Sequence, residues 1–263
     1  MTEPSQPVAD FADRTALITG ASRGIGHAIA AELLTRGACV TITARKPETL
    51  DAAAAELAAL VPDGADRVLA VAGNAGRAED RAEAVARTVE RFGRLDVLVN
   101  NTGINPIYGS LMDADLDGFR KLLDTNVVAA LGFIQQAWRA WMADNGGAVV
   151  SVASVAGLRS SGVLGAYGAS KAALIRLTEE LAWQLGPTVR VNAVAPAVVK
   201  TRFATALYTD REEEASAAYP MKRLGEPADV ARLVAFLASD AASWITGETV
   251  RVDGGLLATG TLG

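Results

Sequence analysis

Short apolar runs alternate with helix-patterned segments along the chain, and this alternation constrains the fold more than any other feature of the sequence. The first run, Thr15 to Thr19, is apolar and β-branched and is followed by glycines, as expected of a buried strand. Apolar side chains then recur at helical spacing between Ile25 and Leu33, Gly37 suits a helix stop, and Cys39 to Thr43 begins the next strand. The order is therefore strand, helix, strand.

The same order continues to the end of the chain. Because the predicted strands are apolar on both faces and alternate with helices, a parallel sheet covered on both sides is expected. We therefore predict an α/β fold, a single-domain doubly wound parallel sheet with helices on both faces, of the Rossmann type. The further elements are helices over about 47–60 and 78–92, and strands over about 68–72, 95–100, 148–152, 189–194 and 249–252.

Nothing in the 263 residues marks a second domain, since the chain has no proline- or serine-rich linker, no low-complexity block and no repeat of fixed period. One α/β domain can reach this length. We expect a flexible tail over residues 1–12 and one domain over residues 13–263. Residues 203–224 differ, because they mix aromatic side chains with Glu212-Glu213-Glu214 and Pro220, and they predict a mobile helical flap over a site.

Charge and metal-ligand content argue against several classes of function. The 25 Lys and Arg residues against 30 Asp and Glu leave a net charge of −5, which disfavours binding to nucleic acid or to a membrane surface. The only cysteine, Cys39, and the only histidine, His27, cannot form a disulfide framework or a metal site within one chain. No apolar run approaches the ~20 residues of a membrane span. We expect a soluble cytoplasmic protein without a metal.

A glycine-rich turn follows the first predicted strand. Thr19 to Gly26 lies between that strand and the first helix, where glycines permit a tight turn and a close approach of backbone N–H groups to a pyrophosphate. Such a turn also serves ordinary loops, but its position after the first strand favours a dinucleotide site.

The residues after the second predicted strand indicate which dinucleotide binds. NAD-binding Rossmann units carry an acidic residue about 20 positions beyond the glycines, whereas NADP requires a cation for its additional phosphate. Ala44-Arg45-Lys46 holds no carboxylate, so Arg45 can bind the 2′-phosphate with its planar guanidinium, and Arg23 can approach from the glycine turn. We predict NADP(H); the alternative is two solvated arginines and the use of NAD.

Tyr167 and Lys171 stand four residues apart, so on a helix their side chains leave the same face. A free phenol titrates near ~10, and an adjacent ammonium would lower that pKa towards the working range. In a reduction, Tyr167 would donate a proton to a carbonyl oxygen, and Ser154, at the end of a predicted strand, would hydrogen-bond the same oxygen. A tyrosine and a lysine at this spacing also occur by chance on amphipathic helices.

In their order along the chain, these motifs resemble those of the short-chain dehydrogenases/reductases, from about Asp13 to Gly255. The segments that carry the resemblance are Thr19 to Gly26 for TGxxxGxG, Asn100 to Gly103 for NNAG with Thr102 in place of alanine, Tyr167 to Lys171 for YxxxK, and Pro196 to Thr201 for PGxIxT. The resemblance implies a catalytic tetrad of Asn126, Ser154, Tyr167 and Lys171 and no metal.

The resemblance also implies how the cofactor is held. Lys171 would hydrogen-bond the nicotinamide ribose, and a relay through that ribose, Lys171 and a water held by Asn126 would return the proton of the tyrosine. Ala197 replaces the family's glycine and would be strained if the position requires a positive φ. Asn74 replaces an aspartate beside the adenine ring. The implied cofactor-binding residues are Gly20, Ser22, Arg23, Gly24, Ile25, Gly26, Arg45, Asn74, Asn101, Gly103, Tyr167, Lys171, Pro196, Val199 and Thr201.

The substrate is left open among several alternatives. Within the family, the sequence looks most like 3-oxoacyl-[acyl-carrier-protein] reductases, which implies a 3-oxoacyl thioester, possibly on acyl carrier protein. Candidate cations for attracting such a carrier are Arg159, Lys200, Arg202 and Arg211. The alternative is a free ketone, sugar, steroid or secondary metabolite, selected by Asn105 to Ser110, Leu158 to Gly165 and the flap. A catalytically silent NADP-binding scaffold is the alternative from another class, and the complete tetrad argues against it.

The resemblance finally implies a homotetramer, which in this family usually forms through two long helices. These helices are expected here at about Leu116 to Ala143 and Tyr167 to Leu185. Trp138, Trp141 and Trp183 lie in them, and we expect core or subunit-contact positions for these large aromatic side chains.

Overall fold

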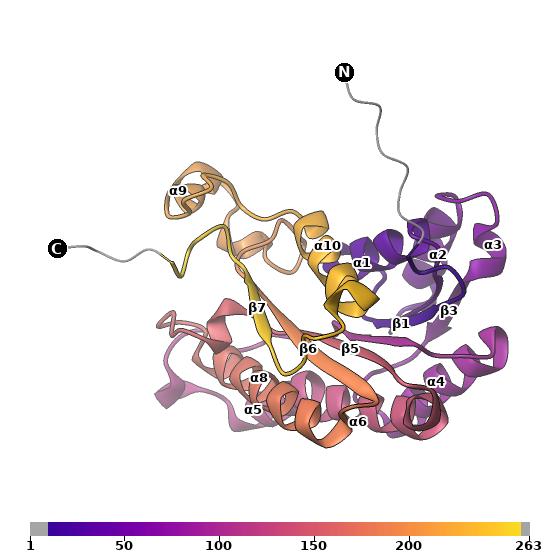
Figure 1. Ribbon diagram of the computed structural model, residues 1–263. Helices are drawn as coiled ribbons and strands as arrows, with labels where there is room; N and C mark the ends of the chain where they lie inside the picture. Colours follow the sequence, from indigo (N-terminus) through magenta and orange to yellow (C-terminus); the bar gives the residue numbers. More distant parts are fainter. Residues whose placement is uncertain (1–9, 259–263) are drawn as a thin grey trace.

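The computed structural model describes residues 10–258 and contains, in that range, one parallel sheet of seven strands in the order β3-β2-β1-β4-β5-β6-β7 (Figure 1). The predicted doubly wound sheet is confirmed. The strands are β1 (Thr15–Thr19), β2 (Cys39–Ala44), β3 (Val68–Ala72), β4 (Val97–Asn100), β5 (Gly147–Val152), β6 (Val189–Pro196) and β7 (Thr249–Val252). Because β1 pairs with both β2 and β4, the chain winds in opposite directions from this point, and a crevice forms at the carboxyl ends of the two strands.

Helices cover both faces of the sheet, as the sequence predicts (Figure 1). One face carries α1 (Gly24–Thr35), α2 (Pro47–Ala58) and α10 (Pro227–Ala238). The other face carries α4 (Ala78–Phe92), α6 (Ala129–Ala137) and α8 (Gly165–Leu185). The shorter helices are α3 (Gly64–Arg67), α5 (Leu116–Leu123), α7 (Ala143–Asn145), α9 (Glu212–Ala217), η1 (Leu111–Asp113), η2 (Asp124–Val128), η3 (Trp138–Met142), η4 (Val155–Gly157), η5 (Thr205–Leu207) and η6 (Asp240–Ala242).

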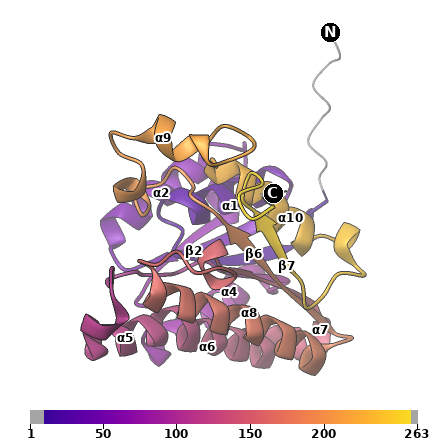
Figure 2. The same ribbon diagram turned by 90° about the vertical axis from the view of Figure 1, so that its left-hand side faces the viewer.

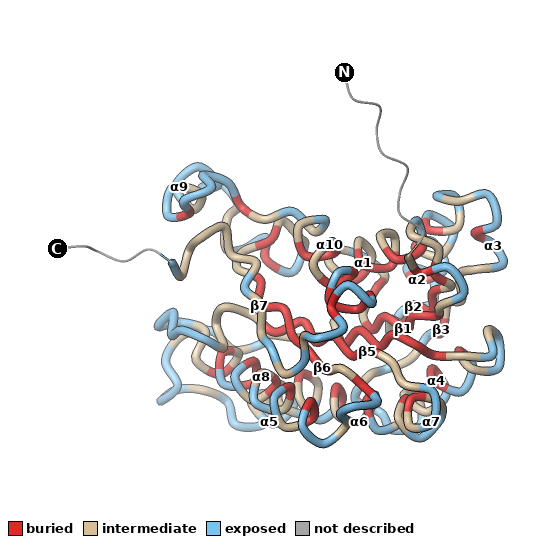
Figure 3. Tube along the Cα trace, in the orientation of Figure 1, coloured by how far each residue is buried: buried red, intermediate tan, exposed pale blue. Residues whose placement is uncertain are grey.

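The core consists of two buried clusters separated by the sheet, whose strands are the most deeply buried part of the chain (Figure 3). Successive residues of β1 point to opposite faces, so Ile18 packs under α1, α2 and α10, whereas Leu17 packs against the side of α4, α6 and α8. This two-sided burial explains why the strands are continuous apolar runs rather than alternating ones.

The folded part of the chain starts earlier than the sequence suggests. Phe11 is fully buried, its backbone N–H donates to Arg36 O at 3.1 Å, and the Arg36 guanidinium lies 5.3 Å from the centre of its ring. The tail expected over residues 1–12 is therefore wrong at residues 10–12, because the buried Phe11 side chain and an ion pair of Asp10 with Arg36 anchor them to the rest of the fold. Residues 1–9 lie outside the described residues.

The helical segment expected at 116–143 is continuous but not regular. Two turns of π-helix, η2 and η3, separate α5, α6 and α7, and such turns are frequent at functional sites. Trp138 and Trp141 are partly buried against the core, whereas Trp183 on α8 is 88% exposed. In residues 10–258, no helix is long and apolar enough to cross a membrane.

Candidate active site

A cleft with a volume of about 1650 Å³ lies at the carboxyl ends of the strands, where the sheet reverses its winding. Every residue that the sequence predicts for cofactor binding lines this cleft. Ser154, Tyr167 and Lys171 also line it, whereas Asn126 lies behind its wall. The structure therefore brings together residues that are far apart in the sequence.

The glycine turn joins the carboxyl ends of β1 and β4. Gly20 has a φ of +66°, and a Cβ on Gly26 would stand 2.4 Å from Asn101 Nδ2, so neither position tolerates a larger residue without a shift. Asn101 Nδ2 donates to Thr19 O at 2.8 Å and to Gly20 O at 3.0 Å. Thr102, which replaces the family's alanine, packs against Gly20, where the missing side chain leaves room for it. The tight turn lines the cleft, and its glycines let a pyrophosphate approach the backbone closely.

Two arginines flank the end of the cleft beyond β2. Arg45 and Arg23 are exposed, line the cleft and form no ion pair within residues 10–258. Asn74 lies on the same side, with its Oδ1 accepting a hydrogen bond from Gly76 N at 3.1 Å. These side chains can hold the adenosine end of a dinucleotide, and the guanidinium groups can pair with an additional phosphate.

Tyr167 and Lys171 occupy the first turns of α8 and face the same cleft. The Lys171 ammonium donates to Val152 O at 2.7 Å and lies 5.6 Å from the centre of the Tyr167 ring. Burial lowers the pKa of Lys171 from its usual 10.5 to about 8. The spacing of four residues thus places the two groups as the sequence predicts.

The pKa of Tyr167 differs from the sequence-based expectation. Burial raises it to about 12, and a hydrogen bond with Ser154, which acts in the opposite direction, does not compensate. The nearby ammonium was expected to lower this pKa, but in the structure the removal of the phenol from water is the larger effect. Tyr167 is therefore a neutral phenol at neutral pH.

Asn126 lies in η2 and is 1% exposed. Its Oδ1 accepts from Ile104 N at 2.8 Å, and its Nδ2 donates to Ile104 O and to Ser170 Oγ, each at 3.0 Å. The side chain therefore fixes the loop after β4 to α8 beside Lys171. The arrangement gives Asn126 a positioning role; the water relay stays a prediction.

Ser154 begins η4, a single turn that packs on α8. Its Oγ accepts a hydrogen bond from Ala156 N at 3.1 Å. A Cβ on Gly157 would stand 2.8 Å from Ala172 N, and one on Gly168 would stand 2.5 Å from Ala156 O. These two glycines, which the sequence analysis missed, allow Ser154 to approach Tyr167. The sequence signal that could have found them is a glycine three residues after Ser154 and another directly after Tyr167.

The segment after β6 forms the wall at the nicotinamide end. Val199 makes a parallel bridge with Gly225, and Lys200 N donates to Gly225 O at 2.8 Å. Ala197 is not among the non-glycine residues with positive φ in the described chain, so alanine fits here without the strain considered from the sequence.

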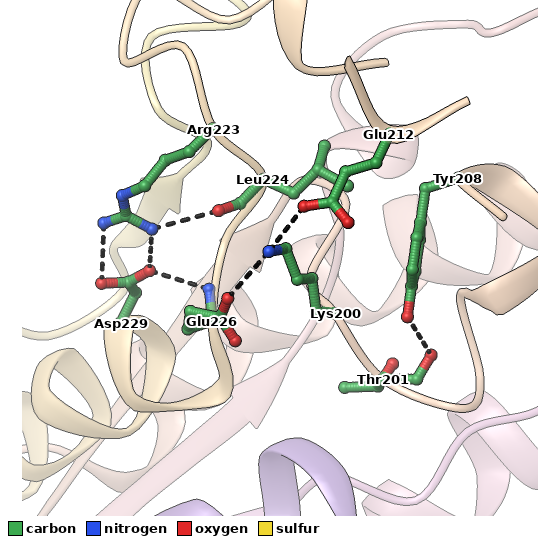
Figure 4. A network of polar contacts seen from close by, with 8 residues as sticks. All are labelled: Lys200, Thr201, Tyr208, Glu212, Arg223, Leu224, Glu226 and Asp229. Atoms are coloured by element: carbon green, nitrogen blue, oxygen red, sulfur yellow. Dashed lines mark hydrogen bonds and ion pairs between the residues drawn. The ribbon is translucent and has the colours of Figure 1, made fainter. Parts of the chain in front are cut away.

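Ion pairs attach the flap to the end of β6. The Lys200 ammonium lies 2.6 Å from Glu212 Oε1 on α9 and 3.2 Å from Glu226 Oε1 before α10 (Figure 4). The Tyr208 hydroxyl donates to Thr201 O at 3.4 Å.

Of the cations considered for attracting a carrier protein, Lys200 is thus already paired, whereas Arg159, Arg202 and Arg211 are exposed. Glu213 and Glu214 are exposed as well, so they form a solvated face of α9.

Apolar and aromatic side chains complete the cleft around Tyr167. The Phe203 ring, from the flap, lies 6.2 Å from the Tyr167 ring at 45°. The segments 105–110, 158–165 and 203–224, expected from the sequence to select the substrate, each contribute side chains. Cleft-lining residues that were not singled out are Tyr108, Leu164, Leu207, Tyr219, Leu256 and Leu257. Leu256 and Leu257 follow β7, and no helical or strand periodicity in that segment predicts that they line the cleft.

The fold and this cleft define a nucleotide-dependent oxidoreductase, and comparison with known proteins gives the family. The family model described as Enoyl-(Acyl carrier protein) reductase matches residues 20–257. Dehydrogenase/reductase SDR family member 4 of Homo sapiens is 41% identical over 251 residues, covering 93% of this chain and 88% of the relative. The corresponding protein of Caenorhabditis elegans is 36% identical over 254 residues, covering 94% and 96%.

Solved structures agree with this assignment. A short-chain type dehydrogenase/reductase from Mycobacterium ulcerans superposes with a TM-score of 0.90 at 34% identity, covering 94% of this chain and 91% of that one. Levodione reductase gives a TM-score of 0.90 at 31% identity, covering 95% and 100%. The chain belongs to the short-chain dehydrogenase/reductase family. It is accordingly an oxidoreductase that uses a nicotinamide cofactor, NAD or NADP.

The buried Lys171 should make stability depend on pH. Its pKa is about 8 in the folded protein and 10.5 in the unfolded chain, so the unfolded chain binds more protons between these values, and stability rises with pH in that window. Compared with Lys171→Met, the wild type should gain roughly 3 kcal/mol in the free energy of unfolding across it. Denaturant titrations of both proteins at several pH values measure this difference; parallel curves would contradict it.

Proposed function

We propose that the protein reduces a carbonyl group to a secondary alcohol with NADPH, and that the substrate is a free ketone. The observation that carries the proposal is the meeting of Tyr167, Ser154 and Lys171 in one cleft, beside the wall formed by the segment after β6. Tyr167 carries its proton at neutral pH, as a donor must, and the Lys171 ammonium 5.6 Å from its ring favours release of that proton by stabilising the tyrosinate.

The residues have distinct parts in this reaction. A nicotinamide held in the cleft would supply a hydride to the carbonyl carbon. Tyr167 gives its proton to the carbonyl oxygen, and the Ser154 hydroxyl hydrogen-bonds the same oxygen. The Lys171 ammonium, 5.6 Å from the ring centre, stabilises the tyrosinate left behind, because opposite charges attract in a site that excludes water. Asn126 holds the adjacent loop and α8 in place, and a proton returns to Tyr167 by way of Lys171.

NADPH is favoured by the charges at the adenosine end of the cleft. Arg45 and Arg23 both line it and lack ion-pair partners within the described chain. An unpaired guanidinium can form bidentate hydrogen bonds with a 2′-phosphate. With NADH, the two cations would face neutral ribose hydroxyls instead.

The mouth of the cleft supports a free ketone better than a thioester on a carrier protein. Of the four cations considered for attracting a carrier, Lys200 is paired with Glu212 and Glu226 beside the exposed carboxylates of α9, which leaves Arg159, Arg202 and Arg211 for that task. Levodione reductase, similar over almost the whole chain, is named for a free dione. The 3-oxoacyl thioester is the second candidate, and the description of the matching family model, which names an acyl-carrier-protein reductase, supports it.

The protein acts as a homotetramer in the cytoplasm. The tetramer is supported by the helical layer of α5, α6 and α8 on one side of the molecule (Figure 2) and by Trp183, which is 88% exposed on α8. The compartment is supported by the single cysteine, Cys39, since a chain with one thiol builds no disulfide framework.

Replacing Tyr167 with phenylalanine tests the proton donor. Tyr167→Phe should lower kcat for carbonyl reduction by about 10² or more, because it deletes the donor hydroxyl. NADPH affinity, measured by fluorescence titration, should stay within about twofold, because the ring remains. Retained turnover would overturn the assignment of Tyr167.

Replacing Arg45 with alanine tests the cofactor preference. Arg45→Ala should raise the KM for NADPH by about 10-fold or more and change the KM for NADH much less, because it removes a charged partner of the 2′-phosphate. Arg87→Ala, on α4 and outside the cleft, is the control and should change neither. An equal loss for both cofactors would refute the preference for NADPH.

A substrate panel tests the proposed carbonyl. Oxidation of NADPH should be faster with cyclic ketones and diketones than with acetoacetyl thioesters, because no free cationic patch is needed to bind them. A higher kcat/KM on the thioesters would instead support the second candidate. Absence of turnover on every carbonyl would contradict the proposed function itself.

A further inference from the structure

The loop that carries Tyr108 is held at three points, by Asn126 of η2, by the segment just before α8 and by the first residue of α8. Asn126 holds its start through the two hydrogen bonds with Ile104. Gly109 N donates to Val163 O at 2.9 Å, and Leu111 packs against Gly165, where a Cβ would stand 3.0 Å from its side chain. Because Gly165 begins α8 only two residues before Tyr167, these contacts hold Tyr108 beside the proton donor.

Tyr108 faces the cleft from that position. It lines the cleft together with Tyr167, and the two phenols are close enough to interact electrostatically, which helps to raise the pKa of Tyr167. Phe203 lies against the Tyr167 ring from the flap. Tyr108 and Phe203 are each 54% exposed, so both present aromatic surface that a ring-shaped substrate can cover.

The hydroxyl of Tyr108 is the one tyrosine hydroxyl without a hydrogen-bond partner in the described chain. The chain has four tyrosines. Tyr208 donates to Thr201 O, Tyr219 accepts from Val198 N, and Tyr167 bonds Ser154. A substrate that covers Tyr108 displaces the water around its hydroxyl, and a hydroxyl left unpaired in this way costs binding free energy. A substrate with an oxygen at this point avoids the cost.

We infer that Tyr108 determines specificity by donating a hydrogen bond to a second oxygen of the substrate, so that the preferred substrates are cyclic diketones and hydroxyketones. This inference rests on the proposed carbonyl reduction. One oxygen of the substrate meets Tyr167 and Ser154, the ring lies between Tyr108 and Phe203, and the second oxygen meets the Tyr108 hydroxyl. Simple ketones of the same size lack that last contact.

The test compares 1,4-cyclohexanedione with cyclohexanone, which differ by the second carbonyl. Tyr108→Phe should lower kcat/KM for the dione by about 3- to 10-fold, the effect of one neutral hydrogen bond, and leave that for cyclohexanone within about twofold. Tyr108→Leu, which also removes the ring, should lower kcat/KM for both ketones. Met112→Ala controls for disturbance of the segment, because Met112 is 89% exposed and lies outside the cleft.

The outcomes separate this inference from the proposed function. If Tyr108→Phe lowers kcat/KM equally for both ketones, or for neither, the role of Tyr108 is wrong while carbonyl reduction stands. If the wild type reduces no ketone, the proposed function fails. The role of Tyr108 is then tested by measuring the affinity for the dione by calorimetry. The wild type loaded with NADP⁺ should then bind the dione about 3- to 10-fold more tightly than Tyr108→Phe does; equal affinities would overturn the inference.

Discussion

The hydrogen bonds of Asn101 hold together the two strands between which the sheet changes direction. Its side-chain amide donates to Thr19 O and Gly20 O, while Asn101 N and Thr102 N both donate to Thr19 Oγ1 at 3.0 Å. The chain leaves β1 and β4 towards opposite sides of the sheet, so a crevice opens between the carboxyl ends of these two parallel strands. The way in which the two ends are joined sets the width of this crevice. The glycine turn starts at the end of β1 and the loop of Tyr108 starts at the end of β4, so this junction positions both of them.

The fold could be predicted almost completely from the sequence, because the alternation of apolar runs and helical periodicity is a property of local residues. Four strand boundaries were displaced by one or two residues, as for β6, which runs to Pro196 instead of Val194. Phe11 was missed for a different reason. A lone aromatic residue in a polar segment shows no periodicity, and its place in the core becomes visible only from its burial and its contacts with Arg36.

The members of the candidate site could be predicted better than their electrostatics. The glycine turn, Ser154, Tyr167 and Lys171 have fixed spacings, and the structure collects them in one cleft. Their pKa values depend on how far the folded protein shields them from water, and sequence spacing does not predict this burial. The ion pairs of Lys200 could not be predicted either, because Lys200, Glu212 and Glu226 come from three separate segments. The proposed role of Tyr108 depends on which tyrosine hydroxyls already have hydrogen-bond partners, and the sequence does not show this.

The two π-turns between α5 and α7 change how this stretch of helix faces the protein. A π-turn holds one residue more than an α-turn, so it rotates everything that follows by roughly 100° about the helix axis. A helical wheel drawn from Leu116 is therefore in phase only as far as Leu123, and the buried stripe of α6, with Phe133 and Ile134, has a phase of its own. The surface that this layer offers to another molecule is thus set by the two π-turns, and neither is visible as a break in the helical sequence.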